Sequence, residues 1–173
     1  MRRRTLLASI AGGAGIFAGC LTDSTTADPS DVYNPTGQAV IRPLEEPYIQ
    51  HGLSEDSEQY LQGRLFQSAD SLAITEREGA SDFSEAIDEL SDDQFAILTA
   101  LRTSASAPAY FWPGETRWSN DVLRIELHRQ RKDPIEAGGE VVGLAITTFD
   151  YEGAFPDTVE LELPSGALFL TRS

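Results

Sequence analysis

Short runs in which apolar and polar residues alternate dominate the second half of the chain, and they constrain the fold more than any other feature. Residues 122–130 are the clearest case. Leu123, Ile125 and Leu127 alternate there with charged side chains. In a strand, this pattern gives one apolar face, and a slip of one residue in register would expose all of it. The run therefore predicts a strand with one face on a core.

Other segments predict strands on similar grounds. Residues 71–75 and 159–163 also alternate, whereas residues 95–101 and 167–170 are short apolar runs. Residues 141–149, VVGLAITTF, are rich in β-branched and apolar residues. That composition is typical of a strand that is covered on both faces.

One short helix is expected in the sequence DFSEAIDEL, residues 82–90. Its large apolar side chains follow the spacing of one helical face. Ser81 or Asp82 can cap the start of this helix, because serine and aspartate side chains accept hydrogen bonds from the first free backbone N–H groups.

Turn-forming sequences separate these segments, and no long helix lies between the strands. The expected turns or loops are residues 102–108, Pro113-Gly114, 132–140, 151–157 and 164–166. The pattern predicts a mainly β fold, an antiparallel β-sandwich or barrel with one short helix. An α+β fold is the alternative.

The first twenty residues differ from the rest of the chain. Arg2, Arg3 and Arg4 precede an uncharged run of small and apolar residues, positions 6–18. As a helix this run would span about 20 Å, which is short of the hydrocarbon core of about 30 Å. The segment therefore predicts a signal peptide and not a transmembrane helix.

Two short motifs in this segment resemble those of exported lipoproteins. Residues 3–7, RRTLL, resemble the twin-arginine export motif, and residues 17–20, FAGC, resemble a lipobox with Phe17 where Leu is usual. A cysteine is required there because the thiolate is the nucleophile that accepts the lipid. The export motif comprises Arg3, Arg4, Leu6 and Leu7, and the lipobox comprises Phe17, Ala18, Gly19 and Cys20. The alternatives are an ordinary hydrophobic N-terminal helix with a buried Cys20, and a signal cleaved without lipidation.

The charge balance is strongly acidic. The chain has 28 acidic and 13 basic residues, a net charge of -15, and Lys132 is its only lysine. This balance weighs against nucleic-acid binding, which needs a basic surface. Repulsion among the carboxylates would be screened in concentrated salt. With the leader, the composition resembles that of haloarchaeal twin-arginine-exported lipoproteins. The alternative is a merely acidic surface, or an acidic face for cations.

The expected organisation follows from these segments. Residues 21–36 are small, polar and proline-bearing, and they cannot bury enough apolar area to fold alone. We expect a signal peptide at 1–19, a lipidated cysteine with a flexible tether at 20–36, an extension or first part of the domain at 37–64, and a β-rich domain at 65–173.

No catalytic or metal centre is predicted. The chain has no Gly-x-Ser-x-Gly motif, and Cys20 is assigned to the lipid. His51 and His128 are far apart in sequence, which disfavours zinc, and no other cysteine exists for copper. Glu126 and His128 share one strand face and could form one edge of a metal site. A solvated polar face, with Arg124 paired to Glu126, explains the same pattern.

Two oxygen-rich segments are candidate calcium sites, residues 54–58 and residues 91–93. Neither has the spacing of an EF-hand loop. In a chain this acidic, such clusters also arise from composition alone, so we expect no metal ion and no cofactor.

Aromatic residues gather between positions 110 and 118. Tyr110, Trp112 and Trp118 form a candidate ligand platform, on which a sugar or another flat molecule could stack. Alternatively, these rings fill one end of the core. The platform requires at least one tryptophan to be partly exposed.

Taken together, these features predict a non-catalytic binding or accessory module, anchored by the lipid on Cys20 at the extracytoplasmic face of the cell membrane. Its ligand or protein partner is not identified by the sequence. An envelope structural protein is the alternative, and an exported hydrolase is less well supported because no catalytic motif is present.

Overall fold

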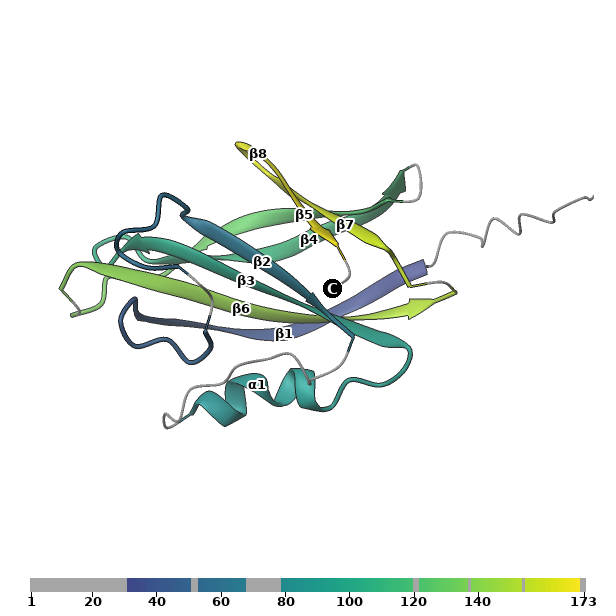
Figure 1. Cartoon of the computed structure of the whole chain (residues 1–173), viewed down its shortest axis with the longest axis horizontal. Coiled ribbons are helices and arrows are strands. Elements are labelled where there is room, and N and C mark those ends of the chain that lie inside the picture. The colour runs from purple at the N-terminus through teal and green to yellow at the C-terminus, as the bar shows by residue number, and fades with distance from the viewer. Residues whose placement is uncertain are drawn as a thin grey trace, which may run out of the picture.

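In the part of the chain that the computed structural model describes, eight strands form two four-stranded sheets, with one helix outside them (Figure 1). The first sheet has the strand order β1-β6-β3-β2, and the second sheet has the order β4-β5-β7-β8. The described residues are 31–50, 53–67, 79–119, 122–136, 138–153 and 155–171. The elements are β1 (Asp31–Pro43), β2 (Leu61–Phe66), α1 (Ala80–Asp88), β3 (Gln94–Ser104), β4 (Ala109–Ser119), β5 (Val122–Arg131), β6 (Glu140–Glu152), β7 (Thr158–Leu163) and β8 (Gly166–Thr171).

The two sheets form a β-sandwich and not a closed barrel, which confirms the predicted mainly β class. Neighbouring strands are antiparallel except for β5 and β7, which are parallel. The parallel pair arises because β6, which lies between them in sequence, crosses into the first sheet. Parallel neighbours need a connection of about a dozen residues or more, and the 13 residues of β6 lie within the one that joins β5 to β7.

Both faces of β6 are buried, as its sequence predicts. On one face, Leu144 and Ile146 join a core cluster that includes Ile87 of α1. On the other face, Phe149 packs between the sheets and stacks on Phe95, with the ring centroids 5.0 Å apart. The first sheet is therefore covered on both sides, by the second sheet on one and by α1 with Leu44, Ile49 and Leu53 on the other.

The predicted short helix is present as α1, and its buried Ile87 faces the first sheet. Its start differs from the prediction. Gly79, with φ 79°, is the N-cap, and no side chain caps the helix. The assignment of Ser81 or Asp82 as the cap was wrong because the helix already begins at Ala80, which places both residues inside the first turn.

The domain begins earlier than the sequence predicts. β1 pairs with β6 from residue 31 onward, so residues 31–36, predicted as part of the tether, belong to the first sheet. Residues 37–64 contain the rest of β1 and the start of β2. The polar, proline-bearing sequence suits an edge strand, in which a bulge at Asn34 and Pro35 accommodates the proline.

Some predictions concern residues outside the described ranges. These are the leader with Cys20, the tether up to residue 30, the strand expected at 71–75, and His51. Among the helical residues that the structure describes, no helix is long and apolar enough to cross a membrane.

Gly143 of β6 sets the distance between the two sheets at one end. A Cβ atom at this position would collide with the carbonyl oxygen of Ala109 in β4, and it would lie 3.0 Å from Cβ of Tyr110. Only a residue without a side chain fits between these two backbones. The first residues of β4 therefore pack directly against the backbone of β6.

Replacing Thr99 with valine is expected to raise the free energy of unfolding by about 1 kcal/mol. Thr99 Oγ1 is buried between the sheets near Ile125, and it has no hydrogen-bond partner among the described residues. Valine keeps the shape of threonine and removes the uncompensated hydroxyl. Ile125→Val, which deletes a methylene-sized group nearby, should lower stability by about 1 kcal/mol. Urea denaturation measures both changes, and a Thr99→Val protein that is less stable than the wild type would contradict the prediction.

Candidate functional site

Tyr110 and Trp112 form an aromatic pair near the start of β4. Phe111, which lies between them in sequence, points into the core, so alternation places the two rings on the opposite side of the strand. Their ring centroids are 6.3 Å apart and the rings are nearly perpendicular, at 81°. Both side chains are only partly buried. The expectation that a tryptophan is partly exposed therefore agrees with the structure.

Trp118 does not join this pair. The pairing of β4 with β5 shifts between Pro113 and Thr116, so that one extra residue is accommodated in β4 as a β-bulge. The extra residue reverses the alternation, and Trp118 packs against the core cluster between the sheets. The predicted three-residue platform is thus divided, with Tyr110 and Trp112 on one side of the strand and Trp118 on the other.

The same bulge explains the local sequence. Pro113 and Gly114 were predicted to form a turn, but β4 continues through them to Ser119. Gly114 is needed because the ring of His128 lies where a Cβ atom would stand. His128 is also the cross-strand partner of Trp112. The glycine therefore allows an imidazole to lie beside the aromatic pair.

His128 and Glu126 do not form part of a metal site in the described ranges. The Nδ1 atom of His128 is 3.9 Å from the Oε1 atom of Glu126, and both side chains are about half exposed. Where the structure describes the chain, no group of three His, Cys, Asp or Glu side chains could hold a metal ion. Arg124 pairs with Glu160 of β7 and not with Glu126 as predicted, because β7 lies directly beside β5.

Ion pairs hold the other end of the second sheet. Arg124 Nε lies 2.8 Å from a carboxylate oxygen of Glu160. Arg117 contacts both carboxylate oxygens of Glu162, at 2.8 and 2.5 Å. Because Arg117 and Arg124 are cross-strand neighbours, these carboxylates also offset a repulsion between like charges. Both arginines are therefore paired with carboxylates of the same sheet.

Three further cations lie at the end of the second sheet that carries Tyr110. The ammonium group of Lys132 lies over the Tyr110 ring, 5.6 Å from its centroid, within the range of a cation–π interaction. Arg129 and Arg131 are exposed cross-strand partners of Phe111 and Ala109, on the other face of the same two strands. Within the described ranges, none of the three forms an ion pair.

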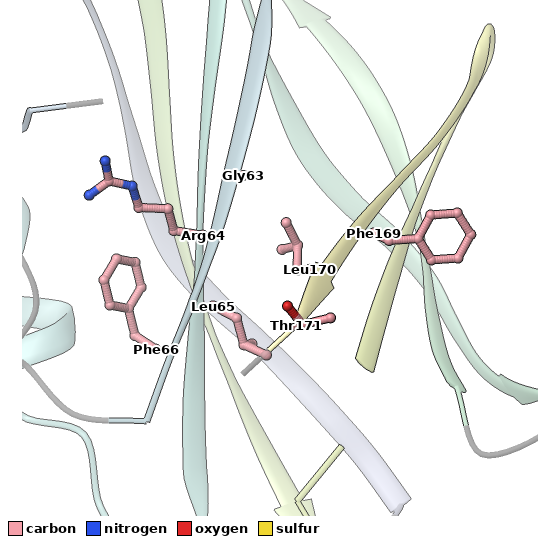
Figure 2. Close-up of a pocket in the computed structure, with 7 residues that line it drawn as sticks. All are labelled: Gly63, Arg64, Leu65, Phe66, Phe169, Leu170 and Thr171. Carbon is pink, nitrogen blue, oxygen red and sulfur yellow. The ribbon is translucent and has the colours of Figure 1, made fainter. Parts of the chain in front are cut away.

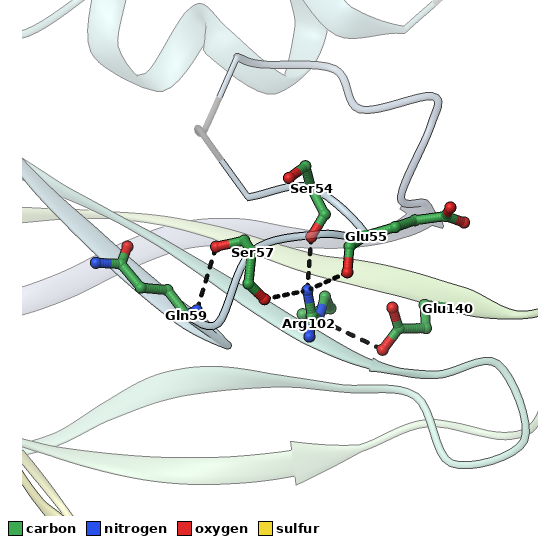
Figure 3. Close-up of polar contacts among 6 residues, drawn as sticks. All are labelled: Ser54, Glu55, Ser57, Gln59, Arg102 and Glu140. Atoms are coloured by element: carbon green, nitrogen blue, oxygen red, sulfur yellow. Dashed lines mark hydrogen bonds and ion pairs between the residues drawn. The ribbon is translucent and has the colours of Figure 1, made fainter.

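The oxygen-rich loop at 54–58 surrounds an arginine and not a metal ion (Figure 3). Arg102 Nη1 donates to the backbone carbonyl oxygens of Ser54 at 2.5 Å, Ser57 at 2.7 Å and Glu55 at 3.3 Å. Its Nε atom lies 3.4 Å from a carboxylate oxygen of Glu140. The carbonyl groups that would be calcium ligands are thus turned toward a guanidinium group, which leaves the calcium hypothesis without support here.

The second oxygen-rich segment, residues 91–93, forms a local turn before β3. Ser91 Oγ donates to a carboxylate oxygen of Asp93 at 2.5 Å. The backbone oxygens of Asp92 and Asp93 accept hydrogen bonds from the hydroxyl and the backbone N–H of Tyr151, each at 2.9 Å. These contacts join the start of β3 to the end of β6, so the segment has a structural role.

A cleft of about 430 Å³ lies where the edge strands β2 and β8 approach each other (Figure 2). Gly63 makes room for Leu168 and Leu170, whose side chains lie about 3 Å from the place of a Cβ atom. Phe169 points away from the cleft and is 61% exposed. Among the lining residues that the structure describes, Arg64 is the one ionisable side chain.

Comparisons with protein-family models, curated proteins and solved structures found no match to this chain. The site is therefore described by its own chemistry, an aromatic pair with cations and polar groups beside it. Sequence analysis missed the part played by Lys132, Arg129 and Arg131. A signal was present, since five of the 13 basic residues lie between positions 117 and 132 in an otherwise acidic chain.

Proposed function

We propose that this protein is a membrane-anchored, extracytoplasmic lipoprotein that acts as a non-catalytic binding module. The leader, with its twin-arginine motif and its lipobox ending at Cys20, supports export and anchoring. The lipid on Cys20 would hold the β-sandwich at the outer face of the membrane, because a two-chain lipid anchors stably where a single acyl chain does not.

The aromatic pair of Tyr110 and Trp112 is the observation that supports a binding role. Large aromatic side chains of small β domains usually belong to the core. These two rings instead lie on the side of β4 opposite the core residue Phe111, with Lys132 over one of them. An aromatic surface with hydrogen-bond donors at its border is suited to stack a ligand and fix its orientation.

The composition supports a highly saline medium for this module. Carboxylates are spread along the whole chain, and the Debye length falls to about 3 Å at 1 M salt, so their mutual repulsion would be largely screened. Binding in such a medium has to rely on direct contacts, such as stacking and short hydrogen bonds, because long-range attraction is screened as well.

Replacing Cys20 with serine is expected to move the protein from the membrane fraction to the soluble fraction, because the serine hydroxyl cannot accept the lipid as the thiolate does. Fractionation of cells that express the full chain, followed by mass spectrometry of the N-terminus, measures the change. Trp112→Ala serves as a control that should stay with the membrane. A Cys20→Ser protein that remains fully membrane-bound would refute the anchor.

A further inference from the structure

The aromatic pair also indicates what kind of ligand it would take, and this inference rests on the proposed binding function. Three polar side chains border the pair on the same side of the strands. Gln130 is the cross-strand partner of Tyr110, His128 is the partner of Trp112, and Lys132 lies over the Tyr110 ring. We call Tyr110, Trp112, His128, Gln130 and Lys132 the aromatic–polar patch.

The composition of this patch fits a carbohydrate. The C–H face of a sugar ring packs on an aromatic side chain, and its hydroxyl groups require hydrogen-bond partners at the border of that ring. The amide of Gln130 both donates and accepts, and the imidazole of His128 does the same when it is neutral. A purely apolar ligand would leave these polar groups without partners, so it fits less well.

The charge of the patch indicates an acidic sugar. Lys132 carries three N–H donors and forms no ion pair within the described residues, so donors remain for a ligand. The carboxylate of Glu126 lies 3.9 Å from His128, and it borders the patch on the side away from Lys132. An anionic group is therefore favoured next to Lys132.

The construction of the strands keeps the patch in place. Gly114, in the bulge of β4, allows the His128 ring to lie beside Trp112. Gly143, which has no side chain, allows the backbone of Ala109 and Tyr110 to pack directly against β6. Because both rings project from strand β4 and not from a loop, the patch is preformed and loses little conformational freedom on binding.

We infer that the aromatic–polar patch binds a polysaccharide whose sugar units carry carboxylate or sulfate groups, with Trp112 and Tyr110 stacking on the sugar and Lys132 contacting the anionic group. A polymer can occupy several such modules at once. Multiple attachment of this kind raises the overall affinity without new contacts on each module.

The test uses the full chain and three defined polymers: polygalacturonate for carboxylates, dextran sulfate for sulfates, and neutral dextran. In a Trp118→Phe background, Trp112 is the only tryptophan, so its fluorescence reports binding at the patch. We expect at least one acidic polymer to change this fluorescence and neutral dextran to leave it unchanged. Lys132→Gln and Tyr110→Ala should each weaken binding about tenfold.

Arg117→Gln is the matched control, because Arg117 lies on β4 but is paired with Glu162, at the other end of the sheet. It removes the same charge and should change the affinity by less than about twofold. Equal binding of neutral dextran, with no effect of Lys132→Gln, would overturn the acidic ligand and leave the binding module intact. No binding of any polymer would overturn the carbohydrate inference, while the Cys20→Ser fractionation tests the anchor independently.

Discussion

Replacing Gly143 with alanine is expected to lower the free energy of unfolding by about 3 kcal/mol, which is at the upper end of the range for overpacking a well-packed site. The new methyl group would collide with the carbonyl oxygen of Ala109 and lie 2.8 Å from its carbonyl carbon. Both contacts are with backbone atoms, so a change of side-chain rotamer cannot relieve the collision. The sheets would have to separate at this end of the sandwich.

A matched control is available at Gly138, which lies in the loop before β6, five residues before Gly143. Gly138→Ala adds the same methyl group where nothing lies within 4 Å, and its stability should be unchanged or slightly higher. Urea denaturation of both variants gives the comparison. Because Gly143 also supports the backbone at Tyr110, the Gly143→Ala variant should lose polymer binding as well. A Gly143→Ala protein as stable as the wild type would show that the sheets are not in close contact here.

Replacing Arg102 with methionine is expected to lower the free energy of unfolding by about 3 kcal/mol. One guanidinium group holds three backbone carbonyls of the loop that joins β1 to β2, and Arg102 is 18% exposed. Methionine keeps much of the packing volume but leaves these carbonyls without a donor. The loop is then expected to detach from β3, which hydrogen–deuterium exchange of residues 53–60 would show.

Two variants separate the hydrogen bonds from the charge. Arg102→Lys retains the charge but has a single nitrogen in place of the guanidinium fork, so it should recover only part of the lost stability. Arg129→Met removes an exposed arginine that has no ion pair within the described ranges, and it should change stability by less than about 0.5 kcal/mol. If Arg102→Met behaves like Arg129→Met, the loop is held by other contacts.

Much of the fold is predictable from hydrophobic pattern because each strand has a distinct environment. Alternation in β5 and β7 corresponds to one face on the core, and the continuous apolar run of β6 corresponds to burial on both faces. Helix α1 also follows from the spacing of its apolar residues. These patterns are local consequences of which side of an element meets solvent.

The parts that were missed depend on contacts between distant segments. Residues 31–36 look like a linker in isolation, and they form a strand because β6 supplies their hydrogen-bond partners. The sequence of Pro113-Gly114 is equally compatible with a turn and with a bulge, and the pairing with β5 decides between them. That choice determines whether Trp118 lies on the side of β4 that carries Tyr110 and Trp112 or faces the core, so the candidate site could be only partly predicted.

The position of β1 has a consequence for how the chain reaches this fold. β1 comes first in the described sequence, yet its neighbour in the sheet is β6, and Asp31 pairs with Glu152. Pairing across such a separation loses the conformational entropy of a long loop before the contacts between the two strands can stabilise it. This behaviour is characteristic of domains that fold in milliseconds to seconds. During synthesis, the first strand leaves the ribosome long before its partner exists. A factor that binds residues 31–43 at that time meets backbone groups without their β6 partners, and β1 joins the sheet only after residue 152 has been made.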